Sequence, residues 1–424
     1  MWRASPLRCK QPKDSLAVRE GVLGLKDIEK AWGVVRPLVR HTPIKRSESL
    51  SGTTHGELWL KMENFQRTGS FKVRGALNKI HNLSPAERKK GVVAASAGNH
   101  AQGVAYAAQK AGVACTIFMP EEASLAKVVA TRGYGADVTL KGRDYQEAFE
   151  HAMAHVKKTG AIYVHAFDDE AVMAGQGTLG LEILDYIPDV DTVLVPIGGG
   201  GLISGVATAL KGRNKKIRVI GVQAEGASSI APSLQKGAPV TLNKVDTVAD
   251  GIAVRNVGKL TFPIIQRVVD QVVTVSESEI AAAILLLLER QKTVVEGAGA
   301  VTLAAAMHGK VDLSGRKACA VLSGGNIDMT LVSRIIRLGL VKARRIAVLE
   351  TTISDRPGSL ASLLNLLGQL KASVIDLHHD RDRTDISLSR TGVEVHLEMR
   401  GPEHIRDVEA ELGKAGYAVK WSQA

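Results

Sequence analysis

The sequence predicts an α/β protein with an open, mostly parallel sheet and helices on both faces, followed by a smaller second domain. Between residues 58 and 340, short β-branched runs alternate with Ala- and Leu-rich runs that are typical of helices. Gly accounts for 42 of 424 residues, whereas aromatic residues make up 4%, a balance that favours layers joined by tight glycine turns. After Val341 the order of the elements changes.

The first part of the chain is expected to supply the parallel sheet. The expected strands are 57–62, 92–95, 116–119, 191–196, 218–223 and 317–322. The expected helices are 71–82, 100–111, 124–131, 202–211, 277–291 and one that follows the last strand through about 338. The run 191–196 is almost wholly apolar, as in buried parallel strands. Ser276 is expected to cap the helix over 277–291.

The tail is expected to form strands at 346–352, 373–382, 389–400 and 417–421, and helices at 357–370 and 402–413. Pro357 suits the first turn of its helix, since proline has no N–H to satisfy there. Leu360, Leu363, Leu364 and Leu367 then share one face. The order β-α-β-β-α-β is that of ferredoxin-like domains.

The net charge of +12 comes from 55 basic and 43 acidic residues. The basic residues lie in short groups, at 211–218, 334–345 and near the N-terminus, and none is a dense run interleaved with aromatics. We therefore interpret them as solvated faces and linkers and expect no nucleic-acid partner. An anionic cofactor or substrate remains compatible with this charge.

Cys9, Cys115 and Cys319 lie far apart in the sequence, which argues against a disulfide framework or a cysteine zinc site. The longest apolar run, 280–288, is too short to cross a membrane, so we expect no membrane partner. The first 25 residues are basic without an apolar core. We predict a cytoplasmic protein, with an organelle transit peptide as the alternative.

Four glycine-bearing turns stand at strand ends, where open α/β sheets bind their ligands. They are 63–72, 96–100, 198–201 and 323–326. Four consecutive glycines at 198–201 let the backbone approach an anion, and the helix that follows adds its dipole. The run lacks the Gly-Lys-Ser/Thr of a P-loop and the dinucleotide spacing, so phosphate without a nucleotide is the interpretation. The turns at 96–100 and 323–326, taken alone, could equally be helix caps.

Lys72 stands where a helix is expected to begin. The positive end of the helix dipole lowers the pKa of a lysine there. A neutral amine is what a Schiff base requires. Taken alone, a single lysine would be read as a surface residue.

Together, the motifs at 64–76, 96–103, 198–202 and 323–326 occur in the order that resembles pyridoxal-phosphate enzymes of the tryptophan-synthase-β group, most closely threonine dehydratases (threonine ammonia-lyases). The resemblance implies fold type II, with two open twisted α/β lobes. It implies a flexible extension over 1–20 and a catalytic domain over 21–341, its smaller lobe over about 66–166. The tail, 342–424, resembles an ACT domain through Asp355-Arg356-Pro357-Gly358-Ser359-Leu360.

The resemblance also implies roles for individual residues. Lys72 would hold pyridoxal 5'-phosphate covalently, Phe71 would lie against the ring, and Asn99 would bind the ring hydroxyl. The other implied cofactor contacts are Gly198, Gly199, Gly200, Gly201 and Leu202 for the phosphate, Ser323 for the pyridine nitrogen and Gly251 for the cofactor edge. The loop implied for the substrate carboxylate is Ser96, Ala97, Gly98, Asn99 and His100. Glu296 would lie near the ring or at a monovalent-cation site.

The implied reaction is the α,β-elimination of L-threonine to 2-oxobutanoate and ammonia, in which the β-hydroxyl leaves first and the resulting enamine tautomerises and loses ammonia. The freed amine of Lys72 would take the Cα proton while the cofactor holds the electrons. A neutral Ser323 does not force protonation of the ring nitrogen as a carboxylate would. The weaker electron sink favours elimination over transamination.

Other activities stay open. A serine dehydratase, or one with dual specificity, is the first alternative, because one methyl is worth only about 1–3 kcal/mol of discrimination. Serine racemases carry Ser where this chain has Ala97, and a methyl cannot transfer a proton. Their divalent-metal site places a carboxylate six residues after a glutamate, whereas Glu225 is followed by Ala231, so no metal is predicted. Intact Lys72 and Ser323 argue against a catalytically silent amino-acid-binding regulator.

The ACT-like tail predicts regulation. Such domains usually pair side by side and bind a small amino acid at the shared edge, here near Asp355, Pro357, Gly358 and Leu360. Isoleucine or valine is the expected effector, and a homo-oligomer, dimer or tetramer, is the expected assembly. The alternative is a purely structural dimerisation module. The choice between isoleucine biosynthesis and threonine breakdown stays open.

Overall fold

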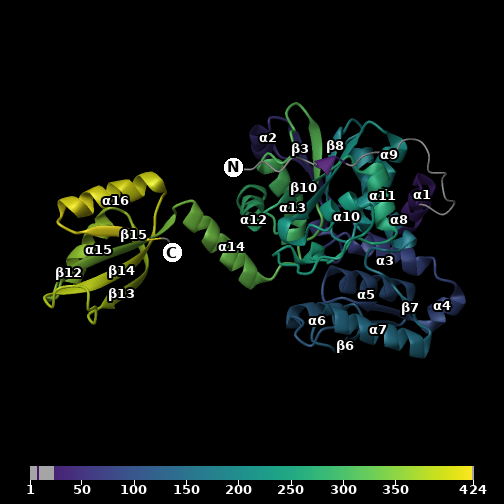
Figure 1. Cartoon of the computed structure of the whole chain (residues 1–424), viewed down its shortest axis with the longest axis horizontal. Helices are drawn as coiled ribbons and strands as arrows, with labels where there is room; N and C mark the ends of the chain where they lie inside the picture. The colour runs from purple at the N-terminus through teal and green to yellow at the C-terminus, as the bar shows by residue number, and fades with distance from the viewer. Residues whose placement is uncertain (1–6, 9–22, 423–424) are drawn as a thin grey trace. The chain divides into compact units, whose positions relative to one another are not determined.

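The computed structural model describes residues 7–8 and 23–422. The chain divides into two compact units, with the division between Ile327 and Asp328 (Figure 1). The predicted extension over 1–20 falls outside the described residues, apart from Leu7 and Arg8, and Cys9 also lies outside them. The domain boundary at 341/342 stays a prediction. Each unit is described by itself below.

The first unit contains a seven-stranded sheet in the order β1-β10-β9-β8-β11-β3-β2. Its strands are β1 (Leu7–Arg8), β2 (Ile44–Arg46), β3 (Glu57–Met62), β8 (Thr192–Pro196), β9 (Arg218–Ala224), β10 (Gln271–Val275) and β11 (Lys317–Leu322). The five central strands are parallel, and β1 and β2 add antiparallel edges. The four strands predicted for this region are confirmed within one residue; β1, β2 and β10 were not predicted.

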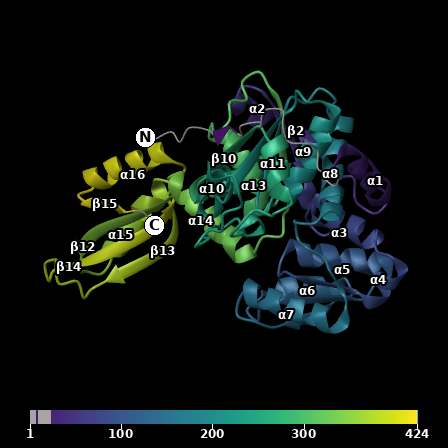
Figure 2. The ribbon, with the colours of Figure 1, turned by 45° about the vertical axis from the view of Figure 1, so that its right-hand side comes forward.

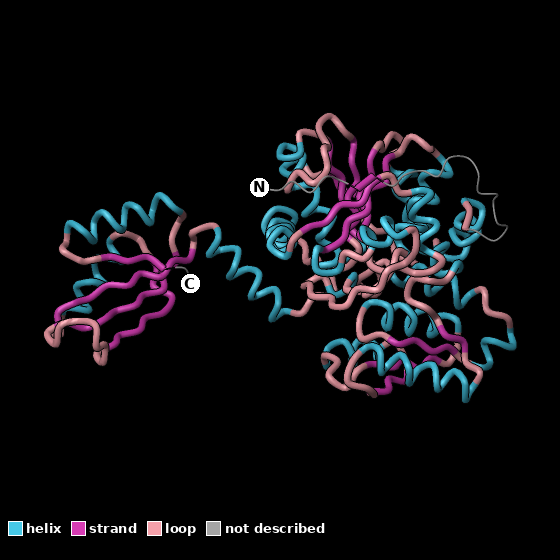
Figure 3. The backbone as a smooth tube through the Cα atoms, in the orientation of Figure 1, coloured by secondary structure: helices cyan, strands magenta, loops and turns pink. Residues whose placement is uncertain are grey.

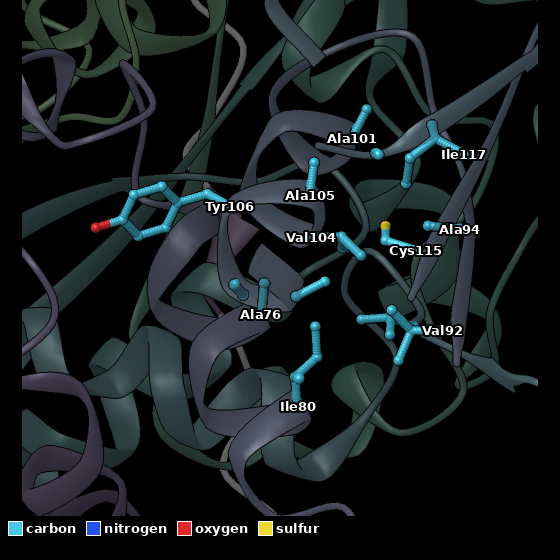
Figure 4. Close-up of a cluster of buried hydrophobic side chains, with 14 of the residues drawn as sticks. Ala76, Ile80, Val92, Ala94, Ala101, Val104, Ala105, Tyr106, Cys115 and Ile117 are labelled. Carbon is cyan, nitrogen blue, oxygen red and sulfur yellow. The ribbon is translucent and has the colours of Figure 1, made fainter. Parts of the chain in front are cut away.

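A second, wholly parallel sheet has the order β6-β5-β4-β7. Its strands are β4 (Val92–Ala95), β5 (Cys115–Met119), β6 (Asp137–Leu140) and β7 (Ile162–Tyr163). Figure 4 shows Ile80 of helix α3 (Lys72–His81) and Val104 of helix α5 (Asn99–Ala111) packed with Val92 and Ile117 of this sheet. The first unit is therefore an α/β structure with two sheets, in agreement with the two implied lobes.

Thirteen helices of the first unit are described, and they surround the strands drawn in magenta in Figure 3. They are α1 (Leu25–Val35), α2 (Glu48–Thr54), α3 (Lys72–His81), α4 (Pro85–Lys90), α5 (Asn99–Ala111), α6 (Leu125–Gly133), α7 (Tyr145–Thr159), α8 (Glu170–Tyr186), α9 (Gly201–Arg213), α10 (Ile230–Lys236), α11 (Thr261–Val268), α12 (Glu277–Gln291) and α13 (Gly297–Met307). Ser276 caps α12, as predicted, and Glu279 completes the capping box. Within the described ranges, no helix is long and apolar enough to cross a membrane.

Helix α8 was not predicted, because its glycines argue against a helix. The structure shows why they are tolerated. A Cβ at Gly175 would lie 2.5 Å from the Arg74 carbonyl oxygen, and one at Gly177 would lie 2.9 Å from the Gly205 carbonyl oxygen. The glycines therefore let α8 pack closely against α3 and α9, beside which it lies in Figure 2.

The second unit begins with α14 (Met329–Lys342) and ends in an antiparallel sheet of order β13-β14-β12-β15. Its elements are β12 (Ile346–Ser354), α15 (Ser359–Gln369), β13 (Ser373–Asp380), β14 (Arg390–Glu398), α16 (Pro402–Lys414) and β15 (Val419–Ser422). The predicted β-α-β-β-α-β order is confirmed. The predicted start of α15 at Pro357 is wrong: Gly358 has φ +90° and caps the helix, which leaves Pro357 in the preceding turn.

Four charged side chains are fully buried together in the first unit. Arg74 donates to both carboxylate oxygens of Glu63, at 2.8 and 2.9 Å, and to Glu182 at 2.7 Å. Lys61 binds Glu182 and donates to the Thr42 carbonyl at 3.0 Å. Burial pushes the pKa of Glu63 upward, but Arg74 and Lys61 outweigh it and hold the pKa at about 2. The two cations and two carboxylates balance each other. Removal of any one of them would leave an uncompensated charge buried in the protein.

Replacing Arg74 with Leu is expected to lower the free energy of unfolding by about 3–5 kcal/mol, because two buried carboxylates would share one cation. Urea unfolding followed by circular dichroism measures the loss. The matched control is Arg143→Leu, which removes an exposed pair with Glu147 and should leave the unfolding curve unchanged. Equal curves for both variants would contradict the prediction.

Candidate active site

A cavity of about 1000 Å³ in the first unit brings together every residue predicted to bind cofactor or substrate. Its lining includes Phe71, Lys72, Ser96, Ala97, Gly98, Asn99, His100, Gly198, Gly199, Gly200, Gly201, Leu202, Gly251 and Ser323. All of them except Gly251 come from the segments that follow β3, β4, β8 and β11, whose carboxyl ends meet there. Gly251 lies in a short 3-10 turn, Asp250–Ile252, between α10 and α11. The individual roles implied for them stay predictions.

Lys72 is the first residue of α3, and its Nζ donates to the Ala166 carbonyl oxygen at 3.0 Å. The Nζ also lies 5.3 Å from the centre of the Phe71 ring. Burial lowers the pKa of Lys72 from 10.5 to about 8, against the opposing charge of Glu296. A substantial neutral fraction at physiological pH gives this amine the nucleophilicity that a Schiff base needs.

Gly198–Leu202, called the glycine loop below, connects β8 to α9. Gly200 has φ +95°, a left-handed conformation that favours glycine. A Cβ on Gly199 would lie 2.4 Å from the Phe167 ring, and one on Gly201 would lie 2.8 Å from the Phe167 backbone. Because α9 begins at Gly201, the first N–H groups of the helix have no partner within it. Backbone N–H groups at a helix N-terminus can cradle an anion, and the role of this loop as a phosphate cradle stays a prediction.

Asn99 lies in a buried polar network. Its Nδ2 donates to both oxygens of Glu296, at 2.8 and 3.0 Å, and its Oδ1 accepts from Asn326 Nδ2 at 2.7 Å. Burial and the charge of Asp250 raise the pKa of Glu296 to about 7. A Cβ on Gly251 would lie 3.1 Å from Glu296 Oε1, so the glycine leaves room for the carboxyl group. Sequence reasoning assigned no role to Asn326, although it ends a motif that was singled out.

The remaining predicted residues have defined partners. Ser323 is 2% exposed, and its Oγ donates weakly to the Ala298 carbonyl at 3.4 Å. Ser96 Oγ accepts from Gly98 N–H at 3.1 Å, which shapes the turn before α5. His100 Nε2 bonds the Val164 carbonyl at 2.8 Å. Burial, with the nearby Lys72 charge, lowers the pKa of His100 to about 3, so this imidazole is neutral.

Sequence reasoning missed the connection between β7 and α8, where His165, Phe167 and Asp168 line the cavity. His165 Nδ1 accepts from the N–H groups of Phe167 and Asp168 at 3.2 and 2.9 Å, and its ring meets that of Phe167 edge to face. The sequence does carry a signal here, because a polar and aromatic run begins at His165, two residues after the end of β7. None of these residues belongs to a glycine turn, which is the pattern from which the other site residues were predicted.

The cavity residues fit a phosphorylated aldehyde cofactor. A lysine amine of lowered pKa could bond the aldehyde carbon. The glycine loop, which packs so closely on Phe167 and Thr261 that Cβ atoms would not fit, could hold the phosphate through its backbone N–H groups. Polar groups on Asn99 and Ser323 line the same cavity. Within the described residues, no group of three or more His, Cys, Asp or Glu side chains could hold a metal ion. The site thus defines an enzyme class that uses a lysine-bound, phosphorylated cofactor.

The chain belongs to the pyridoxal-phosphate dependent enzymes, and the pattern of that family matches residues 35–324. It is similar to the L-threonine ammonia-lyase of Thermotoga maritima, with 49% identity over 399 residues, 94% of this chain and 99% of that protein. Its structure is similar to threonine deaminase isoform 2 from Solanum lycopersicum, with TM-score 0.72 and 37% identity over 77% of this chain and 99% of the other. It is also similar to the structure of maize serine racemase, with TM-score 0.71 and 34% identity over 76% of this chain and 99% of the racemase chain.

The lowered pKa of Lys72 predicts a pH dependence for cofactor attachment to the apoprotein. The rate should rise about tenfold per pH unit up to about pH 8 and level off above it, because only the neutral amine reacts. Stopped-flow measurement of the visible absorbance of the bound cofactor tests this. Glu296→Gln should move the midpoint to lower pH, since the carboxylate raises the pKa of Lys72. A midpoint near 10.5, as for a solvated lysine, would contradict the prediction.

Proposed function

We propose that this enzyme converts L-threonine to 2-oxobutanoate and ammonia. One observation carries the proposal: Lys72, the turn over 96–100, the glycine loop and Ser323 line one cavity, which brings together the protein groups that the mechanism below uses. The similarity to L-threonine ammonia-lyase over 99% of that protein supports the same substrate.

In this mechanism, pyridoxal phosphate, when bound, accepts the electrons left at the substrate Cα after proton removal. Lys72 would hold the cofactor until the substrate amine displaces it, and its freed Nζ would then take the Cα proton. The turn over 96–100 opens α5, where backbone N–H groups at a helix N-terminus suit the substrate carboxylate. The same lysine would bond the cofactor again at the end of the cycle.

Two residues that line the cavity favour elimination over transamination and racemisation. Ser323 presents a neutral hydroxyl, so no carboxylate holds a proton on the cofactor ring. Ala97 presents a methyl group, which cannot return a proton to the opposite face of Cα. Without that second acid, racemisation is disfavoured although the fold is similar to serine racemase.

The test measures 2-oxo-acid release from L-threonine and L-serine and D-serine formation from L-serine. We expect release from threonine with the higher kcat/KM. Faster release from serine would instead assign a serine dehydratase, and D-serine as the main product would assign a racemase. A protein that binds the cofactor but turns over none of these substrates would support the silent regulator and overturn the proposal.

We also propose that residues 342–424, which lie in the second unit, form an ACT-type regulatory domain. Its ferredoxin-like order supports this, and the aligned length of 399 of 424 residues extends the similarity to the Thermotoga protein into this unit. The turn at Asp355–Leu360 is exposed or half-buried, and Val374 and Ile375 of edge strand β13 are 42% and 55% exposed. We propose that the β13 edge pairs with the same edge of a second copy, and that the effector amino acid binds beside it near Asp355–Leu360. Cytoplasmic location and a dimeric or tetrameric assembly stay predictions.

Replacing Gly358 with Asp is expected to abolish isoleucine binding to the intact enzyme. Gly358 has φ +90°, so any side chain strains the turn, and a carboxylate would repel the effector's own. Isothermal titration measures the heat of binding. Gly368→Asp is the matched control, because it adds the same charge on α15 where a Cβ meets nothing within 4 Å. Isoleucine heats in the Gly358 variant equal to those of the control and wild type would refute the assigned site.

A further inference from the structure

The connection between β7 and α8 touches both the lysine and the glycine loop. Within four residues it supplies the Ala166 carbonyl that accepts from Lys72 Nζ, the Phe167 ring that packs on Gly199, and the carboxylate of Asp168. Neither Phe167 nor Asp168 has a role in the reaction derived above. The side chain of Asp168 contacts the start of helix α11, and the start of that helix in turn contacts the glycine loop.

Asp168 caps the N-terminus of α11. Its Oδ1 accepts from the N–H groups of Leu260 and Thr261, at 2.8 and 3.3 Å, and its Oδ2 accepts from Lys259 N–H at 3.0 Å. A Cβ on the preceding Gly258 would lie 2.2 Å from Asp168 Oδ1, so the carboxylate is enclosed by this turn. Three backbone donors on one carboxylate hold the segment from Gly258 to Thr261 in place.

That segment in turn holds the glycine loop. Gly258 N–H donates to the Gly199 carbonyl oxygen at 3.1 Å, and Thr261 Oγ1 donates to the same oxygen at 2.7 Å. In a trans peptide the C=O of Gly199 and the N–H of Gly200 point in opposite directions. Fixing this carbonyl toward the Gly258–Thr261 segment therefore fixes the Gly200 N–H away from it. The direction of an N–H in the glycine loop thus depends on Asp168 through two intervening contacts.

We infer that Asp168 is a positioning residue for phosphate: by capping α11 it orients the glycine loop that receives the cofactor phosphate. The inference rests on the assignment of the cofactor and not on the choice of substrate. The hydrogen bonds of the Asp168 carboxylate lead to the glycine loop, whereas the contact of this connection with Lys72 is made by the Ala166 carbonyl. Loss of the carboxylate should therefore weaken binding of pyridoxal phosphate and spare binding of pyridoxal. Both compounds share the aldehyde that reacts with Lys72, and they differ in the phosphate.

The experiment titrates the apoprotein of the full chain with each compound and measures dissociation constants from the visible absorbance of the bound cofactor. For Asp168→Ala we expect the Kd for pyridoxal phosphate to rise about tenfold or more, and that for pyridoxal to change less than about twofold. Asp168→Asn keeps one oxygen acceptor and should fall between wild type and Ala. The control is Asp169→Ala, which removes the neighbouring cap of α8 and its pair with Lys79 but touches neither α11 nor the glycine loop.

Thr261→Val provides a second route if Asp168→Ala does not fold. It removes the hydroxyl on the Gly199 carbonyl at constant shape, and the same selective loss of phosphate affinity is expected. Equal weakening of both compounds, or no change in either, in the folded variants would overturn the inference. A wild-type protein that binds pyridoxal phosphate without turning over threonine would contradict the proposed substrate but would not contradict this inference.

Discussion

The variant Lys72→Ala is expected to lose at least about 10⁴-fold in activity and to take up no covalently bound cofactor, because one amine both attaches the cofactor and moves the Cα proton. The wild-type protein should show the visible absorbance of a lysine-bound cofactor, and the variant should not. Steady-state release of 2-oxobutanoate and the absorption spectrum measure the two losses.

The matched control for this variant lies on the same helix. Lys79 is two turns further along α3 and pairs with Asp169 at 2.6 Å, partly exposed and outside the cavity. Lys79→Ala should keep the spectrum and most of the activity. Unchanged circular dichroism of Lys72→Ala would show that the loss is chemical. A colourless wild type, or an active Lys72→Ala, would contradict the assignment of this lysine.

The second large effect is expected at Gly199. Alanine there would place its Cβ 2.4 Å from three atoms of the Phe167 ring, which real packing does not allow. The loop must shift, and with it the N–H groups that face the phosphate. We expect affinity for pyridoxal phosphate to fall by about fivefold to 150-fold, as an overpacking cost of about 1–3 kcal/mol implies. Equilibrium titration of the apoprotein measures it.

A compensating variant identifies the cause of that loss. The double variant Gly199→Ala/Phe167→Ala removes the ring that the new methyl meets, so part of the affinity should return. Gly133→Ala is the control, because its Cβ would meet nothing within 4 Å. If Gly199→Ala binds as tightly as wild type, the close approach of Phe167 has no part in forming the cradle.

The difference between the predicted and observed folds follows from what local sequence can encode. Strands β3, β4 and β11 and the capped helix α12 have the predicted bounds, because their apolar runs and cap residues are contiguous in the chain. Helix α8 was missed since three glycines oppose it locally, and only packing against α3 and α9 favours them. The start of α15 was wrong by two residues because proline and glycine compete for the same boundary, and the left-handed Gly358 decides it.

The sequence by itself determined the kind of chemistry. The glycine loop and Ser323 follow apolar strands directly, and Lys72 begins a helix after a glycine-bearing turn. Residue type and position beside a strand or helix end are properties of a short segment. Tertiary structure alone decided which distant groups meet. Asn99 reaches Glu296 across 197 positions, Arg74 reaches Glu182 across 108, and Asp168 caps a helix more than 90 residues away. A buried charge or amide needs partners that no local pattern specifies, and only the arrangement of the two sheets supplies them.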